Sequence, residues 1–210
     1  MDAVESTAFG TVCDKPYIAI LAGSRKGEIS RMMPVCMEVA DRLHALPEYA
    51  GHKFIVAGAP ARSGEDYASW AGPRKDYVEL LFGRTYDVLK GAQAAIINSG
   101  TASLEAALIG TPQVVCWSTS KVTAFVARKI LHVMDHIKYI SLGNLILDKL
   151  AFRELVQEEF TADEVLNEVR RLCEDSSYRG GMLSDYAAIK EALGGGGASR
   201  AVAKEMISLL

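Results

Sequence analysis

The stretch AIINSGTASLE, residues 95–105, joins a short apolar run to a segment with helical character. The apolar residues are typical of a buried strand, and the small residues after them are typical of a tight turn before a helix. Glu105 stands about one turn inside this predicted helix. Such a turn places backbone N–H groups and the positive end of a helix at the carboxyl edge of a parallel sheet.

Two interpretations of this stretch are open. The turn could bind a phosphate while Glu105 accepts hydrogen bonds from a vicinal diol, which would suit a nucleotide or a nucleotide-sugar. Alternatively, Ser99 or Thr101 caps the helix and Glu105 stabilises its first turn. Taken alone, the stretch favours the second interpretation, because short motifs carry a real risk of false matches.

Apolar runs alternate with helical patterns over the first 160 residues. This alternation predicts the α/β class, with a Rossmann-like parallel sheet and helices on both faces. The predicted strands lie at 17–22, 53–58, 78–82, 94–97, 113–117 and 139–142. The predicted helices lie at 34–46, 86–91, 101–109 and 122–134. Pro34 fits the first turn of its helix, and residues 59–75 are predicted to form a long surface loop.

The chain has 210 residues, half of them hydrophobic, which suits one α/β domain with extensions. After residue 160 the pattern is helical, with helices expected from residue 161, over 181–193 and over 199–210. Four glycines at 194–197 predict a flexible joint between the last two helices. We therefore divide the sequence into a segment at 1–16, a Rossmann-like domain at 17–160 and a helical extension at 161–210 that packs on the same domain.

The formal net charge of −3 gives no overall attraction to polyanions, so we expect no nucleic-acid partner. No apolar run reaches the roughly 20 residues that a membrane span needs. The first residues also lack a secretory signal pattern. Cys36 and Cys116 lie in apolar segments, as buried thiols of a reducing compartment do. These features predict a soluble, cytoplasmic protein.

His132 and His136 have the spacing of a metal pair but lack the neighbouring glutamate of a zinc protease and an evident third ligand. We therefore expect no metal and no other cofactor. The predicted helix at 122–134 is amphipathic, and Lys121, Arg128 and Lys129 give it positive charge. Its polar face is either simply solvated or contacts anionic lipid.

Gly23, Ser24 and Arg25 follow the first predicted strand. Small residues here could let a diphosphate approach the backbone, and Arg25 could pair with its charge. A tight turn with a solvated arginine fits the same residues equally well. The dinucleotide fingerprint G-x-G-x-x-G is absent from this turn.

Several short blocks follow one another along the chain: LAGSRKGEI (21–29), YDVL (86–89), SGTASLE (99–105), TPQVV (111–115), YISLGNL (139–145), ELVQEE (154–159), LGG (193–195) and GAS (197–199). In their order, these blocks resemble the lipid-A-disaccharide synthase family. The resemblance covers nearly the whole chain. This sequence departs from the family pattern at Gly143 and Arg153, where proline is common, and at Lys149, where arginine is usual.

The resemblance implies the carboxyl-terminal half of a two-domain GT-B glycosyltransferase, with residues 1–16 as the remnant of the crossover between halves. The family is an inverting glycosyltransferase that uses a UDP-sugar as substrate. It joins UDP-2,3-diacylglucosamine to 2,3-diacylglucosamine 1-phosphate in lipid A biosynthesis and releases UDP. The catalytic base is expected in the other half, so this chain alone is expected to be inactive. Lipid substrates also raise the expectation of peripheral contact with the inner membrane through Lys121, Arg128 and Lys129; homo-oligomerisation is an open alternative.

The resemblance also implies a set of donor-binding positions. Those near the donor diphosphate are Gly23, Ser24, Arg25, Ser99, Gly100 and Thr101. Glu105 matches the acid that holds the ribose hydroxyls, and Asn144, Gln157 and Glu158 match further cleft positions. The alternatives are half of another GT-B enzyme, such as a UDP-GlcNAc transferase or epimerase, and a nucleotide-binding domain without catalysis.

Overall fold

Six parallel strands form a single sheet in the computed structural model, which describes residues 4, 7–119 and 138–194. The strands are β1 (Tyr17–Leu21), β2 (Lys53–Gly58), β3 (Val78–Phe82), β4 (Ala94–Asn98), β5 (Gln113–Trp117) and β6 (Glu154–Val156). Their spatial order is β3-β2-β1-β4-β5-β6, the arrangement of a doubly wound nucleotide-binding fold. The predicted α/β class and Rossmann-like sheet are therefore confirmed.

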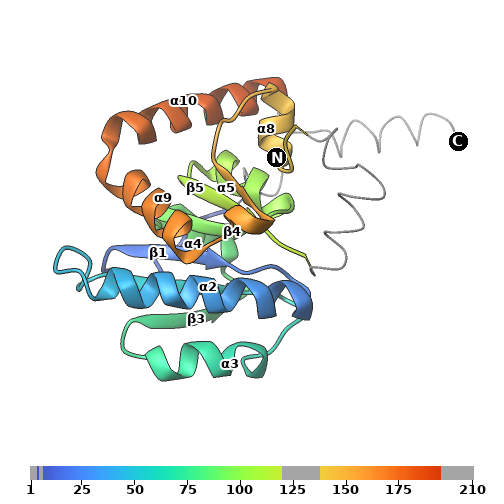
Figure 1. Cartoon of the computed structure of the whole chain (residues 1–210). Coiled ribbons are helices and arrows are strands. Elements are labelled where there is room, and N and C mark those ends of the chain that lie inside the picture. Colours follow the sequence, from blue (N-terminus) through green and yellow to red (C-terminus); the bar gives the residue numbers. More distant parts are fainter. Residues whose placement is uncertain (1–3, 5–6, 120–137, 195–210) are drawn as a thin grey trace, which may run out of the picture.

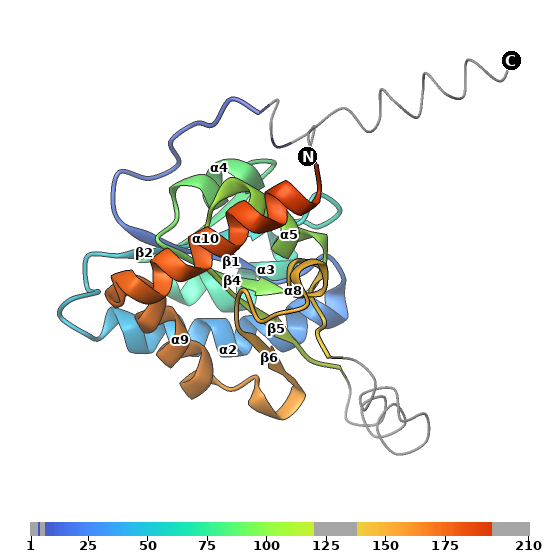
Figure 2. The ribbon, with the colours of Figure 1, turned by 90° about the horizontal axis from the view of Figure 1, so that it is seen from above.

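Helices cover both faces of this sheet (Figures 1 and 2). They are α2 (Lys26–His44), α3 (Glu65–Ala71), α4 (Thr85–Gly91), α5 (Thr101–Ile109), α8 (Leu142–Leu147), α9 (Ala162–Glu174) and α10 (Ser176–Ala192), with 3₁₀ turns η1 (Gly72–Arg74) and η3 (Gln157–Glu159). Side chains alternate along each strand. Ile18 and Ile20 therefore join the core under α2 and α9, whereas Ala19 and Leu21 join the core under α4 and α5.

Helix α2 begins eight residues before the predicted start, so that Pro34 lies inside it. An interior proline costs about 3 kcal/mol, because it removes a backbone hydrogen bond and crowds the preceding turn. Buried side chains nevertheless continue on both sides of it, including Ile29, Met33 and Leu43. Each contributes about 1.5–3 kcal/mol when fully buried, so packing outweighs the proline penalty. The prediction that Pro34 opens the helix is wrong.

The predicted loop at 59–75 contains α3 and η1. Tyr67 of α3 is fully buried, and its hydroxyl accepts a hydrogen bond from the amide of Ala59 at 3.1 Å. One large apolar side chain thus anchors a segment whose glycines, proline and charges are typical of a loop. The prediction of an unstructured loop is wrong over this part.

Residues 139–142 form no strand, and helix α8 begins at Leu142. The amides of Ile140 and Ser141 donate instead to the side chain of Glu154, at 2.8 and 2.9 Å. The sixth strand is β6, which follows later and has only three residues. A side-chain carboxylate therefore takes the place of a strand partner, and the predicted sixth strand is wrong.

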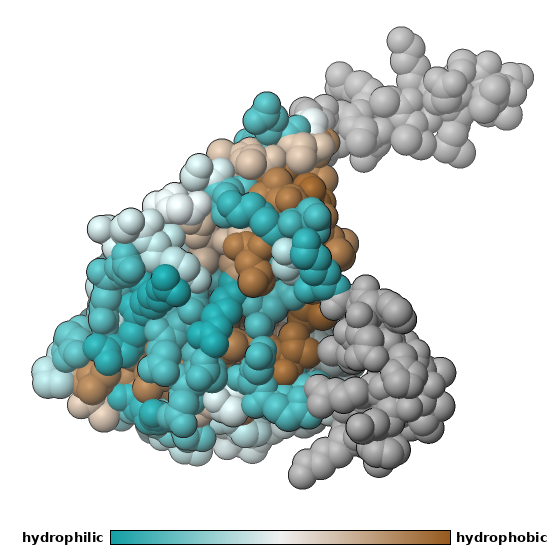
Figure 3. All heavy atoms as spheres, turned by 45° about the horizontal axis from the view of Figure 1, so that its top comes forward, coloured by the Kyte–Doolittle hydropathy of each residue, from teal (hydrophilic) through white to brown (hydrophobic). Residues whose placement is uncertain are grey.

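Helices α9 and α10 pack against the strand-bearing part of the chain and share its core through Val165, Val169 and Tyr186. Thr161 is the N-cap of α9, which begins at Ala162, next to the predicted start. Helix α10 begins at Ser176 rather than at residue 181, because Asp175 caps it. Apolar surface lies on the side that carries α8 and α10 (Figure 3). Exposed leucines of these helices include Leu142, Leu145 and Leu183. The predicted helix at 199–210 lies outside the described residues.

The segment before β1 is attached to α4. The amide of Gly10 donates to Asp87 Oδ1 at 2.7 Å, and Arg84 Nη2 donates to the carbonyl of Thr11 at 3.2 Å. From the sheet, the buried Tyr17 hydroxyl donates to the carbonyl of Val88 at 3.0 Å. Helix α4 has only seven residues, so these contacts with other elements fix its position.

Candidate functional site

A cavity of about 580 Å³ opens at the carboxyl ends of β1 and β4. These strands are neighbours, and the chain leaves them toward α2 on one face and α5 on the other. In open α/β sheets, this switch point is where ligands bind. Seven of the ten predicted site residues line the cavity, namely Gly23, Ser24, Arg25, Ser99, Gly100, Thr101 and Glu105.

The turn after β1 requires a glycine. Gly23 has φ +98°, in the left-handed region that favours glycine. A Cβ atom at Gly23 would lie 2.6 Å from Glu28 Oε2 and 3.0 Å from Asn98 Nδ2. The missing side chain therefore lets Glu28 and Asn98 approach the turn from α2 and β4.

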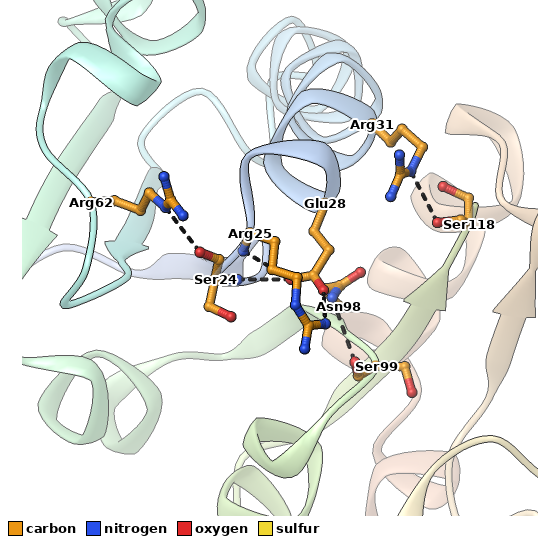
Figure 4. A network of polar contacts seen from close by, with 8 residues as sticks. All are labelled: Ser24, Arg25, Glu28, Arg31, Arg62, Asn98, Ser99 and Ser118. Carbon is orange, nitrogen blue, oxygen red and sulfur yellow. Dashed lines mark hydrogen bonds and ion pairs between the residues drawn. The ribbon is translucent and has the colours of Figure 1, made fainter. Parts of the chain in front are cut away.

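Glu28 binds this turn from the first turn of α2 (Figure 4). Its Oε2 accepts from the amides of Ser24 and Arg25, at 2.9 and 3.1 Å, and its Oε1 accepts from Arg25 Nη1 at 2.7 Å. Burial opposes ionisation of Glu28, but the two amides and the guanidinium together hold its pKa below the usual value. The backbone amides of Ser24 and Arg25, which could otherwise bind a diphosphate, therefore donate to a carboxylate of the chain itself.

Arg25 is the one cation that lines the cavity within the described part of the chain. Its side chain is 82% exposed, whereas that of Glu28 is 18% exposed. The bond to Glu28 uses one N–H group of a guanidinium that has five. Arg25 can therefore stay paired with Glu28 and still donate to an anion in the cavity.

Two further arginines donate hydrogen bonds to backbone carbonyls near this turn (Figure 4). Arg62 Nε donates to the carbonyl of Ser24 at 3.0 Å, and Arg31 Nε donates to the carbonyl of Ser118 at 3.0 Å. The first contact ties the turn to the segment after β2, and the second ties α2 to the end of β5. These two contacts therefore connect the turn after β1 and helix α2 to the segments that follow β2 and β5.

The turn after β4, beside the turn after β1, also lines the cavity. Ser99 is held by two bonds: its amide donates to the carbonyl of Cys116 at 2.8 Å, and its hydroxyl donates to the carbonyl of Ile140 at 3.3 Å. Gly100 is the N-cap of α5, and no side chain caps this helix end. The interpretation that Ser99 or Thr101 caps the helix is therefore wrong. The first amides of α5 have no acceptor within the helix, so its positive end lies at the cavity wall.

Glu105 comes from the second turn of α5 and lines the same cavity. Its side chain is half-buried, and its Oε1 accepts a hydrogen bond from the hydroxyl of Tyr86 on α4 at 3.1 Å. The other carboxylate oxygen, Oε2, can accept from a ligand. This geometry suits a group with neighbouring hydroxyls, such as a ribose.

Asn144 lies outside this cavity. It is fully buried at the start of α8, and its Nδ2 donates to the carbonyl of Phe152 and to Glu154 Oε1, at 2.9 and 2.8 Å. Its Oδ1 accepts from the amides of Ala151 and Phe152, at 2.8 and 3.2 Å. The amide group of Asn144 is therefore used to hold the segment between α8 and β6.

Gln157 and Glu158 lie in η3, just after β6. Neither lines the cavity between β1 and β4. Gln157 has φ +53°, and its Oε1 accepts from the amide of Thr119, which links the ends of β5 and β6. Glu158 is exposed. Of the ten predicted positions, the structure thus brings seven together and places these two and Asn144 on the β5–β6 side.

The positions that depart from the family pattern have local partners. Lys149 pairs with Asp185 at 2.8 Å, and Arg153 pairs with Glu164 at 2.5 Å. A Cβ atom at Gly143 would lie 2.8 Å from the ring of Phe152. Ion pairs and close packing within the chain thus account for these residues without a ligand.

Some sequence predictions lie outside the described residues. They include the predicted helix at 122–134, the metal interpretation of His132 and His136, and the basic surface of Lys121, Arg128 and Lys129. In the described residues, no helix combines the length and the apolar character needed to cross a membrane.

Glu28 and Tyr86 were not predicted as site residues, although both line the cavity. Glu28 stands three residues after Arg25, which is the spacing of a capping box, but arginine is not a residue that this pattern expects at the N-cap. Tyr86 meets Glu105 from a different helix, 19 residues earlier in the chain. No local pattern reveals that contact.

Comparison with solved structures defines the class of fold. CalG4, the calicheamicin glycosyltransferase, has a TM-score of 0.56 at 18% identity, over 93% of this chain and 42% of that chain. The glycotransferase of kitacinnamycin has a TM-score of 0.54 at 13% identity, over 89% and 42%. The described fold is therefore the α/β architecture of one half of a GT-B glycosyltransferase.

The family model of lipid-A-disaccharide synthetase matches residues 4–194, and the chain belongs to this family. The lipid-A-disaccharide synthase of Trichlorobacter lovleyi is 32% identical over 206 residues, and that of Myxococcus xanthus is 36% identical over 209 residues. Each alignment covers 98% of this chain but only 52% and 53% of the respective relative. The chain thus spans about half the length of these relatives.

Proposed function

We propose that this chain is the donor-binding half of a lipid-A-disaccharide synthase. It would bind UDP-2,3-diacylglucosamine and, together with the other half of the enzyme, transfer diacylglucosamine to 2,3-diacylglucosamine 1-phosphate with release of UDP. One observation carries the proposal: Arg25, the start of α5 and Glu105 line one cavity at the switch point. A cation, a helix end and a carboxylate suit a diphosphate joined to a diol.

In the proposed reaction, an acceptor hydroxyl attacks the anomeric carbon as the bond to the UDP oxygen breaks, which inverts the configuration. Arg25 and the amides of α5 would stabilise the charge on departing UDP, and this role requires no metal. The acceptor must also lose a proton to a base. We expect that base in the other half, so this chain alone would bind donor without transfer.

The pairing of Glu28 refines this proposal. The amides of Ser24 and Arg25 already donate to Glu28, so they are not the expected phosphate donors. The diphosphate would instead meet the Arg25 guanidinium and the start of α5. Gly23 and Ser24 then serve by shaping the turn.

An assay of this chain joined to its other half could also reveal one of two different functions. Nucleotide binding without turnover would leave this chain a binding domain even when it is joined to its partner half. Transfer or epimerisation of another UDP-sugar would make it half of a different GT-B enzyme. Membership of the lipid-A-disaccharide synthetase family favours the first proposal over both.

We further propose a cytoplasmic protein that contacts the inner membrane through Lys121, Arg128 and Lys129. The support is their charge in an amphipathic sequence pattern and the lipid nature of the proposed substrates. Changing all three residues to Glu should reduce co-sedimentation with anionic vesicles. Unchanged co-sedimentation would remove this part of the proposal.

Calorimetry with UDP tests the donor site in the 210-residue chain. Glu105→Gln keeps the shape but removes the charge, and it should weaken UDP binding about tenfold or more. Glu174→Gln is a matched control, because Glu174 also accepts from a tyrosine, Tyr49, but lies outside the cavity. A chain that binds no UDP, or that binds it equally well with Glu105→Gln, contradicts the proposal.

A further inference from the structure

Tyr86 contacts the proposed ribose acceptor from a neighbouring helix. Its hydroxyl lies 3.1 Å from Glu105 Oε1, and both residues line the switch-point cavity. Burial, followed by the negative charge of Glu105, raises the pKa of Tyr86. The hydroxyl therefore keeps its proton and acts as the donor, which leaves Glu105 as the acceptor.

The ring of Tyr86 is partly buried and packs on the hydrophobic core. It packs against the core cluster formed by β1, β2, β4, α4 and α5, which includes Val88 and Ala106. The hydroxyl thus lies at the cavity wall while the ring is held by the core. A donor held in this way restrains the carboxylate that it contacts.

The helix that carries Tyr86 is fixed in turn. The hydroxyls of Tyr17 and Thr111 donate to the carbonyls of Val88 and Leu89, at 3.0 and 2.8 Å. A Cβ atom at Gly91 would lie 2.4 Å from the Tyr17 hydroxyl, so the glycine admits this contact. Side chains from β1 and from the turn before β5 therefore hold the carboxyl end of α4.

We propose that Tyr86 is a positioning residue that orients Glu105 and thereby makes the site select ribonucleotides over deoxyribonucleotides. This inference rests on the proposed function, in which Glu105 accepts from the ribose hydroxyls. The Tyr86 hydroxyl holds Oε1 of the carboxylate, so Oε2 keeps one direction toward the diol. An acceptor that is oriented before binding loses less entropy when the ligand arrives.

The test compares UDP with 2′,3′-dideoxy-UDP by calorimetry in the 210-residue chain. Tyr86→Phe should weaken UDP binding about fivefold to tenfold and leave binding of the dideoxy nucleotide within about twofold. Tyr49→Phe is the matched control, because it removes another tyrosine–glutamate bond, of 2.9 Å, outside the cavity. It should change neither affinity.

A double-mutant cycle separates positioning from general support. Because Tyr86 acts through Glu105, Tyr86→Phe should have no further effect on UDP affinity in a Glu105→Gln background. In a nucleotide-free readout, Glu105→Gln should lower the pKa of Tyr86, measured by NMR of ring-labelled tyrosine. An unchanged pKa would show that the two residues do not interact in solution and would overturn the inference.

The outcomes distinguish this inference from the proposed function. Equal weakening of both nucleotides by Tyr86→Phe, or additive loss in the double variant, overturns the positioning role alone. Loss of the preference for UDP in Glu105→Gln, with no effect of Tyr86→Phe, also removes only the inference. A wild-type chain that does not prefer UDP to its dideoxy analogue overturns both.

Discussion

The Arg25 guanidinium lies 2.7 Å from the Glu28 carboxylate, which also accepts from two amides of the turn after β1. The carboxylate of Glu28, from the first turn of α2, therefore accepts from the two amides that could otherwise bind an anion of a ligand. The turn is therefore shaped by the chain before any nucleotide arrives. This relationship gives Glu28 a measurable role in stability.

Glu28→Ala should lower the free energy of unfolding by about 1–2 kcal/mol at pH 7, because it removes a capping carboxylate. The pKa of Glu28 is lowered in the folded chain, so its contribution is present above the ordinary glutamate pKa, about 4.3, and is lost as the pH falls below it. Urea unfolding at pH 7 and near pH 3 measures both effects. A difference between wild type and variant that does not shrink in acid would contradict this role.

Gly23→Ala should destabilise the fold by about 1–3 kcal/mol, because alanine strains a left-handed backbone and its Cβ meets Glu28 Oε2. Gly83→Ala is the matched control. Gly83 also has a positive φ, +69°, but a Cβ atom added there would have no neighbour within 4 Å. Chemical denaturation should show the larger loss for Gly23→Ala. Equal losses would mean that backbone strain alone matters.

Asn144→Ala should cost about 2–4 kcal/mol of stability, because it removes a buried group that makes four hydrogen bonds. Since Asn144 lies outside the cavity, the affinity for UDP should change little where the variant is folded. Denaturation gives the first quantity and calorimetry the second. A stable variant with strongly weakened UDP binding would assign Asn144 to the ligand instead.

Metal removal should leave the transfer reaction unchanged. The proposed mechanism stabilises UDP with Arg25 and the start of α5, so it calls on no divalent cation. The measurement is disaccharide formation by this chain joined to its upstream half, with and without EDTA. A loss of activity that Mg²⁺ or Mn²⁺ restores would show that a cation shares the charge of the diphosphate.

The strands that the sequence predicts best are those buried on both faces. The continuous apolar runs of β1 and β4 give a strong signal, and the turns that follow them line the cavity. Strand β6 has only three residues, too few for an apolar pattern. In the segment at 139–142, the amides of Ile140 and Ser141 donate to the side chain of Glu154 and not to the backbone of a strand. A side chain that bonds to backbone amides in place of a neighbouring strand leaves no local sequence pattern.

The site was predictable to the extent that it is local. Glu105 follows its own strand closely, so its placement in the cavity can be read from the order of strand, turn and helix. Tyr86 and Asn144 depend on contacts between separate elements. For that reason local sequence patterns do not reveal the role of Tyr86, and they do not show that the Asn144 amide holds neighbouring backbone rather than a ligand.

The attachment of Gly10 to Asp87 has a mechanical consequence. The segment before β1 and the tyrosine next to Glu105 share one short helix, with Asp87 directly after Tyr86. A displacement of residues 9–11 must either break the bonds to Asp87 and Arg84 or pull on α4. The α4 helix thus connects the segment that leads into β1 with Glu105 at the cavity, so a movement of one can be passed to the other.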